Sequence, residues 1–114
     1  MELKRILEVN LTRSDRWHPG GINDWSLSDW AVALSGEVGE VCNVVKKMNR
    51  LRDGLAQKGV LTQAQYMEEL RFELADVFLY LLLLSARSGI DLEAAVVEKF
   101  NKVSEEYGFP ERLP

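Results

Sequence analysis

Apolar residues recur along this chain at the three- and four-residue spacing of amphipathic α-helices, with hardly any of the alternation that is typical of strands. The first such stretch predicts a helix over residues 2–14, with leucine and isoleucine gathered on one side. Pro19 and the glycine pair Gly20-Gly21 follow it, and residues of this kind do not continue a helix.

The second predicted helix spans residues 26–52 and is marked by its N-terminal residues. Ser26 and Asp29 have the spacing of a capping box, in which each side chain accepts a hydrogen bond from the other residue's backbone N–H. Residues 52–61 contain two glycines and are predicted to form a loop.

The third predicted helix spans residues 62–88, and the fourth spans residues 91–107. Thr62 and Gln65 repeat the capping-box spacing at the start of the third helix, and Gly89 follows its end as a C-terminal glycine. The fourth helix begins with an aspartate, a favourable N-cap residue.

The third helix differs from the others because residues 72–86 are apolar on nearly every side. A helix of this kind must be covered all round, and four helices in a chain of 114 residues cover it only in part. We therefore expect a single all-α domain over residues 1–114, a four-helix bundle assembled as a homodimer or homotetramer.

Composition narrows the classes of function. An apolar fraction of 46% and a charged fraction of 28% are typical of a folded globular protein. A net charge of −4 disfavours binding to nucleic acid or to an anionic membrane. The single cysteine suits a reducing compartment, and no apolar run is long enough for a signal peptide or a membrane span. We expect a cytoplasmic protein that acts on a small molecule.

Four carboxylates stand out because they occur within apolar helices. Glu37 and Glu40 are three residues apart on the second helix, and Glu73 and Asp76 repeat this spacing on the third. Residues three apart lie on the same side of a helix, one turn from each other. Burying an isolated carboxylate costs several kcal/mol unless a positive charge compensates it. If the two helices face each other, the four acids meet in one cleft that requires cations.

Oxygen ligands alone suit a hard cation, so we expect Mg²⁺, for which Mn²⁺ can substitute. Zinc is disfavoured because His18 and Cys42 are the only histidine and the only thiol. Either acidic pair alone is more often a solvated helix side; both pairs together, on two apolar helices, favour a metal site. Lys47 and Tyr80 lie two turns beyond the acids at nearly the same angle around their helices, where they would reach a bound substrate.

These residues resemble those of the MazG-like all-α nucleoside triphosphate pyrophosphohydrolases, a superfamily that includes dCTP pyrophosphatases and dimeric dUTPases. The family hallmark is Glu-x-x-Glu on one helix and Glu-x-x-Asp on the next, found here within residues 33–40 and 73–80. The similarity continues through Ser88-Gly89-Ile90 and into the last helix, and it covers about residues 17–110.

The resemblance implies an enzyme that removes (deoxy)nucleoside triphosphates from the nucleotide pool, a housecleaning hydrolase. The four acids would bind Mg²⁺, and water would attack the α-phosphorus to release a monophosphate and pyrophosphate. Tyr80, Lys99 and Asn101 match family positions that contact the substrate. One glutamate would accept a proton from the attacking water. Glu37 and Glu40 are equally eligible.

An aromatic segment precedes the second helix and has two interpretations. Trp17, His18 and Trp25 would form a wall or lid on which a nucleobase stacks, or their rings would close the end of a small core. Both interpretations stay open, whereas Trp30 is expected in the core or at an interface.

Two other classes of function compete with the hydrolase. A di-iron or di-manganese carboxylate bundle is disfavoured because such sites use Glu-x-x-His motifs, and no predicted helix carries a histidine. A non-catalytic helical oligomer with a binding or regulatory role is the other alternative. It predicts that the protein does not bind magnesium.

Overall fold

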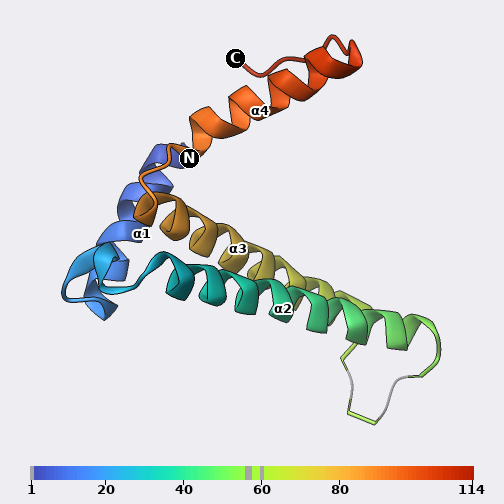
Figure 1. Cartoon of the computed structure of the whole chain (residues 1–114). Coiled ribbons are helices and arrows are strands. Elements are labelled where there is room, and N and C mark those ends of the chain that lie inside the picture. Colours follow the sequence, from blue (N-terminus) through green and yellow to red (C-terminus); the bar gives the residue numbers. More distant parts are fainter. Residues whose placement is uncertain (1, 56–57, 60) are drawn as a thin grey trace.

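The computed structural model describes residues 2–55, 58–59 and 61–114, and within them it contains four α-helices, one short 3₁₀-helix and no strand. The all-α prediction is therefore confirmed. The predicted loop over residues 52–61 lies partly outside the described residues, at Ala56, Gln57 and Val60. The helices, seen in Figure 1, are α1 (Leu3–Trp17), η1 (Gly21–Asp24), α2 (Leu27–Arg52), α3 (Gln63–Arg87) and α4 (Leu92–Tyr107).

Local sequence signals set the starts of the long helices, as predicted. At α2 the Ser26 hydroxyl accepts from the Asp29 backbone N–H at 3.1 Å, and the Asp29 carboxylate accepts from the Ser26 N–H at 2.9 Å. Thr62 and Gln65 make the same reciprocal pair at the start of α3. The side chain of Asp91 accepts from a backbone N–H in the first turn of α4. These bonds satisfy N–H groups that lack partners within the helix.

Gly89 ends α3 for the reason expected of a C-terminal glycine. Its φ angle of +70° lies in the left-handed region, where a side chain is unfavourable. This turn lets the Gly89 N–H reach the Ala86 carbonyl at 3.1 Å and the Ile90 N–H reach the Ser85 carbonyl at 3.0 Å.

The first helix is longer than predicted, since α1 continues to Trp17 rather than ending at Ser14. Nothing before Pro19 breaks the helix, and the residue preceding a proline is the first one biased away from helical geometry. The short η1 that follows was not predicted.

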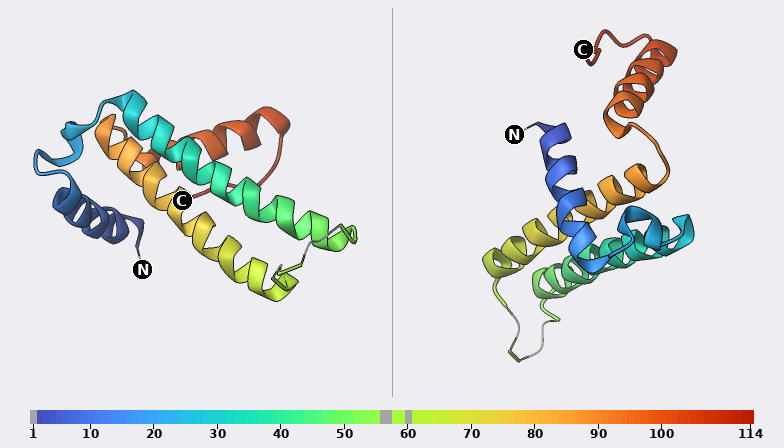
Figure 2. Two further views of the ribbon diagram at one scale, coloured as in Figure 1. Left: turned by 90° about the horizontal axis from the view of Figure 1, so that it is seen from below. Right: turned by 90° about the vertical axis from the view of Figure 1, so that its left-hand side faces the viewer.

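The packed part of the molecule is built on α2 and α3. These two helices lie side by side and antiparallel along their length, and α1 packs across α3 near the end where η1 also lies (Figures 1 and 2). The buried apolar side chains come from these helices, and among the described residues they are Trp30, Val44, Tyr66, Leu82 and Leu83. A core this small leaves much apolar surface on α2 and α3 uncovered.

The last helix, α4, projects away from the other three, so one chain does not close the predicted four-helix bundle (Figure 1). Val96 and Phe100 on α4 are exposed apolar residues without a neighbouring helix in the chain to cover them. The radius of gyration is 17.9 Å, whereas a compact chain of this length has about 13 Å. The chain is therefore open rather than compact.

The length and hydropathy of each helix show whether it could cross a membrane. In the part of the chain that the structure describes, no helix combines the length and the apolar character needed to cross a membrane.

Candidate functional site

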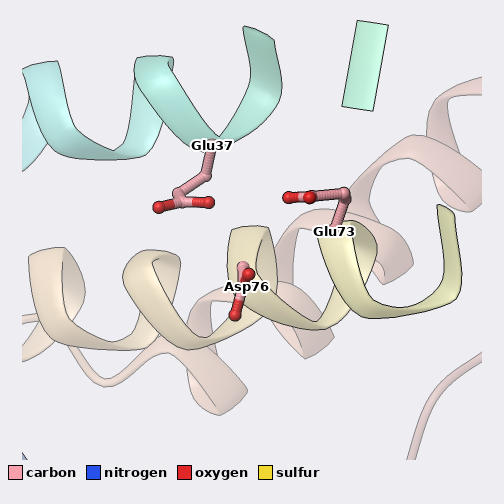
Figure 3. Close-up of side chains that lie close together, drawn as sticks. All are labelled: Glu37, Glu73 and Asp76. Atoms are coloured by element: carbon pink, nitrogen blue, oxygen red, sulfur yellow. The ribbon is translucent and has the colours of Figure 1, made fainter. Parts of the chain in front are cut away.

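Three of the four predicted metal ligands meet between α2 and α3. Glu37, Glu73 and Asp76 each offer a carboxylate oxygen, and these oxygens all lie within 4.8 Å of one another. Figure 3 shows Glu37 extending from α2 across to the two acids of α3. The central structural prediction, that the acidic sides of two helices face each other, is confirmed for these three residues.

The helical repeat explains why Glu37 points inward. It lies seven residues, or two turns, from both Trp30 and Val44, and both of these side chains are buried. Glu73 has the same relation to the buried Tyr66 and to Tyr80 on α3. Two buried stripes therefore each carry a carboxylate at the position where an apolar residue would otherwise pack.

The three carboxylates repel one another and are partly removed from water, so their charged forms are unfavourable without a bound cation. Burial raises the pKa of Glu37 above its ordinary value, and the charges of Asp76, Glu73 and Glu40 raise it further. No salt bridge among the described residues involves these acids. An oxygen-only group that lacks a protein cation fits a hard divalent ion such as Mg²⁺ or Mn²⁺.

Glu40 is the fourth predicted ligand, and it lies outside the group of three. It is exposed, because three residues along α2 rotate its side chain by about 60° from that of Glu37. Its charge nevertheless contributes to the raised pKa of Glu37. Its role as a ligand stays a prediction.

The raised pKa of Glu37 predicts how stability changes with pH. Between the ordinary value of 4.5 and the higher value in the folded protein, the folded state binds more protons than the unfolded state, so stability falls as pH rises. Glu37→Gln removes this effect. It is therefore expected to stabilise the metal-free protein at about pH 7 but not at about pH 4.

Thermal unfolding of the wild type and Glu37→Gln across this pH range, without metal, provides the measurement. A melting-temperature difference that is the same at both ends of the range would contradict the electrostatic account. Added Mg²⁺ should stabilise the wild type more than the variant, because a bound cation removes the repulsion that the substitution relieves.

A cavity of about 330 Å³ adjoins the acids. Its lining includes Glu37 and Asp76 together with a group of aromatic side chains. The rings of His18, Trp25 and Trp30 are mutually close, with centroids 4.6 to 5.2 Å apart. We call this cavity the aromatic pocket. A π-rich wall beside a metal-binding group suits a molecule with a flat ring and a charged tail.

Hydrogen bonds from α2 and α3 hold this wall in place. The Arg87 Nε atom donates to the Trp25 carbonyl at 2.8 Å, and the indole N–H of Trp30 donates to the Ile22 carbonyl at 3.1 Å. In the turn itself, the Gly20 N–H donates to the Asp24 carboxylate at 2.9 Å. A Cβ atom at Gly20 would collide with that carboxylate, so a larger residue there would force the Asp24 side chain to move.

The structure brings four of the predicted substrate-binding residues together in the aromatic pocket. Tyr80, Trp17, His18 and Trp25 all line it. The indole of Trp17 is mostly exposed, whereas Trp30 is buried, as expected for a core residue. The substrate-binding roles of the four lining residues stay predictions.

The other three predicted substrate contacts lie outside the pocket of the single chain. Lys47 is exposed on α2, and Lys99 and Asn101 lie on the projecting α4. The Asn101 amide bonds both backbone groups of Leu113, donating to its carbonyl at 3.0 Å and accepting from its N–H at 2.7 Å. This amide ties the C-terminal segment to α4, and its role toward a substrate stays a prediction.

Sequence reasoning missed the contribution of α1 to the pocket. Asn10, Arg13 and Ser14 all line it, and the Arg13 guanidinium lies 5.5 Å from the Trp17 ring centroid. A signal was present, because Asn10 and Ser14 continue the apolar stripe of α1 at helical spacing. Polar residues at core positions are candidates for function.

Comparison with known families agrees with this geometry. The family model of the MazG nucleotide pyrophosphohydrolase domain matches residues 26–107, which include α2, α3 and α4 and all four acids. The chain therefore belongs to the MazG family, as its motifs predicted. No curated protein and no solved structure matched the chain.

Proposed function

We propose that this protein hydrolyses a (deoxy)nucleoside triphosphate to the monophosphate and pyrophosphate in a Mg²⁺-dependent reaction, as a housecleaning enzyme of the nucleotide pool. The observation that supports this most strongly is the convergence of Glu37, Glu73 and Asp76 beside an aromatic pocket in a MazG domain. A nucleotide has the two parts that such a site accommodates, a flat base and a polyanionic tail.

Charge explains why the reaction needs a metal. A triphosphate carries several negative charges, and the carboxylates of the site would repel it. Mg²⁺ held by Glu37, Glu73 and Asp76 would reverse the sign of the site, polarise the α-phosphoryl group and lower the pKa of a bound water. The MazG domain and the oxygen-only ligand group both favour this ion over zinc or a di-iron centre, since the group contains no histidine.

The chain's own residues divide the remaining tasks. Glu37, Glu73 and Asp76 hold the metal, and Glu40, outside that group, is the carboxylate left to accept a proton from the attacking water. The aromatic pocket binds the base, and Tyr80 lies one turn beyond Asp76, between the acids and the indoles, where the sugar or α-phosphate would lie.

We propose that the working enzyme is a homodimer or homotetramer. The chain exposes 8328 Å², about 2000 Å² more than a compact monomer of its mass. That excess, counted for two chains, falls in the range of obligate homodimer interfaces. An apolar groove between α2 and α3, which residues leading into α4 also line, is a candidate contact surface, and we call it the α2–α3 groove. Its apolar lining residues are Leu27, Ala31, Leu81, Leu84, Ile90 and Leu92.

Oligomerisation also bears on Lys99 and Asn101, the two predicted substrate contacts on α4. Within one chain α4 stands apart from the aromatic pocket, so these residues reach a substrate only if assembly brings an α4 to a pocket. Lys47 stays on α2 and is proposed to meet the outer phosphates at the rim.

The proposed reaction is tested by a panel of dNTPs and NTPs with and without Mg²⁺, scoring pyrophosphate against orthophosphate. We expect pyrophosphate and the monophosphate as direct products, only when Mg²⁺ or Mn²⁺ is present. Orthophosphate as the direct product would contradict attack at the α-phosphorus. If no nucleotide is hydrolysed with either metal, the non-catalytic oligomer becomes the better interpretation.

A further inference from the structure

Two of the side chains that line the aromatic pocket are polar, buried and carried by α1. Asn10 and Ser14 line the pocket four residues apart, one helical turn, and they are 6% and 1% exposed. Both precede residues 26–107, so they lie outside the part of the chain that the MazG family model matches. Their role therefore has to be read from the structure itself.

Ser14 is unusual because its hydroxyl is buried without a partner. Among the described residues, its Oγ atom has no hydrogen bond. An unpaired buried hydroxyl destabilises a fold, and alanine would fill the same space without this cost. A ligand that hydrogen-bonds this hydroxyl provides a reason for a serine at this position.

Asn10 has a defined orientation. Its Nδ2 atom donates to the backbone carbonyl of Leu79 on α3 at 2.9 Å. A carbonyl oxygen only accepts hydrogen bonds, so the amide nitrogen must face Leu79, and the Oδ1 atom is left as an acceptor. Asn10 thus has a fixed acceptor, and Ser14, which lines the same pocket, has an unpartnered hydroxyl that can donate.

We infer that Asn10 and Ser14 form hydrogen bonds with the polar edge of the nucleobase. This pair favours a base with an exocyclic amino group beside an unprotonated ring nitrogen. The amino group donates to Asn10 Oδ1, and the ring nitrogen accepts from the Ser14 hydroxyl. Cytosine and adenine share this pattern. Uracil and hypoxanthine reverse it, since their carbonyl oxygen would face the oxygen of Asn10. This inference rests on the proposed function, because it takes the occupant of the pocket to be the base of that nucleotide.

The pocket is suited to such an occupant on other grounds. The rings of Trp25, Trp30 and His18 provide surfaces for stacking, which does not distinguish one base from another. Discrimination therefore has to come from polar atoms at the edge of the ring. Sites that hydrogen-bond a substrate reject analogues lacking the matching group far better than apolar pockets reject a change in size.

Ser14→Ala tests this inference through substrate preference. We expect the wild type to favour dCTP over dUTP and dATP over dITP in kcat/KM, for at least one pair. Loss of one hydrogen bond should reduce that preference by roughly three- to tenfold. Thr12→Ala is the matched control, since it removes an exposed hydroxyl from the same helix, and it should leave the preference unchanged. A wild type without preference, or an unchanged preference in Ser14→Ala, overturns the inference.

A second readout separates this inference from the hydrolase proposal. Titration of metal-free protein with dCMP and dUMP, and with dAMP and dIMP, is followed by tryptophan fluorescence, because indoles line the pocket. If the wild type binds the nucleotide with the amino-bearing base more tightly, and Ser14→Ala reduces this preference, base recognition is supported even if no triphosphate is hydrolysed. Equal binding within both pairs overturns it even if hydrolysis is observed.

Discussion

Glu73→Gln is expected to reduce Mg²⁺-dependent pyrophosphate release by about a hundredfold or more, because outer partners of metal ligands already contribute 10- to 100-fold. The substitution keeps the shape of the side chain and removes one of the three carboxylates that meet between α2 and α3. Fold and stability should be retained. Without metal, the loss of one like charge beside Glu37 should leave the melting temperature unchanged or raised.

Glu68→Gln is the matched control for this variant. Glu68 lies on the same helix but on another side of it, exposed and paired with Arg71. Its replacement should leave the steady-state rate of pyrophosphate release within about twofold of the wild type, since exposed ion pairs contribute little. Equal losses in the two variants would indicate a general effect of charge on α3 rather than a metal site.

Leu27→Glu is expected to weaken self-association by about a hundredfold or more, because it places an unpaired charge in an apolar contact. Leu27 lies in the α2–α3 groove and is 48% exposed in the single chain. The chain itself should tolerate the change, since glutamate is favourable in the first turn of a helix. In a symmetric interface the charge appears on both copies.

Val32→Glu is the control for the interface. Val32 is on the same helix, 71% exposed and outside the α2–α3 groove. Light scattering coupled to size-exclusion chromatography should show smaller particles for Leu27→Glu and wild-type mass for Val32→Glu. A wild type that is monomeric at all concentrations, or a Leu27→Glu variant of unchanged mass, would contradict the proposed contact surface.

The sequence predicted best what depends on neighbouring residues. The capping box of Ser26 and Asp29 and the glycine that ends α3 involve groups within a few positions of each other, so spacing alone located them. The inward direction of Glu37 was predictable for a related reason. Glu37 lies two helical turns from both Trp30 and Val44, and large apolar residues at that spacing predict a buried side.

Tertiary arrangement was harder to predict. The position of α4 depends on packing that one chain does not supply, so helical periodicity predicted the helix but not its separation from α1, α2 and α3. Glu40 shows a similar limit. Its spacing from Glu37 matches that of Asp76 from Glu73, yet only Asp76 joins the group, because the relative rotation of α2 and α3 decides which acids meet.

The pocket residues of α1 show what the motif-based prediction overlooked. Asn10 and Ser14 are far in sequence from the acidic pairs, and only the packing of α1 against α3 brings them to the aromatic pocket. Conversely, Lys99 and Asn101 were predicted as substrate contacts by resemblance alone, and within one chain they do not line the aromatic pocket.

Calorimetric titration of Mg²⁺ into the nucleotide-free protein tests the central claim most directly, because it asks whether the carboxylate group of α2 and α3 binds a cation. We predict saturable binding to the wild type and to Glu68→Gln, and its loss or severe weakening in Glu73→Gln. If Mg²⁺ does not bind to the wild type, or binds equally to all three proteins, then Glu37, Glu73 and Asp76 do not form the metal centre.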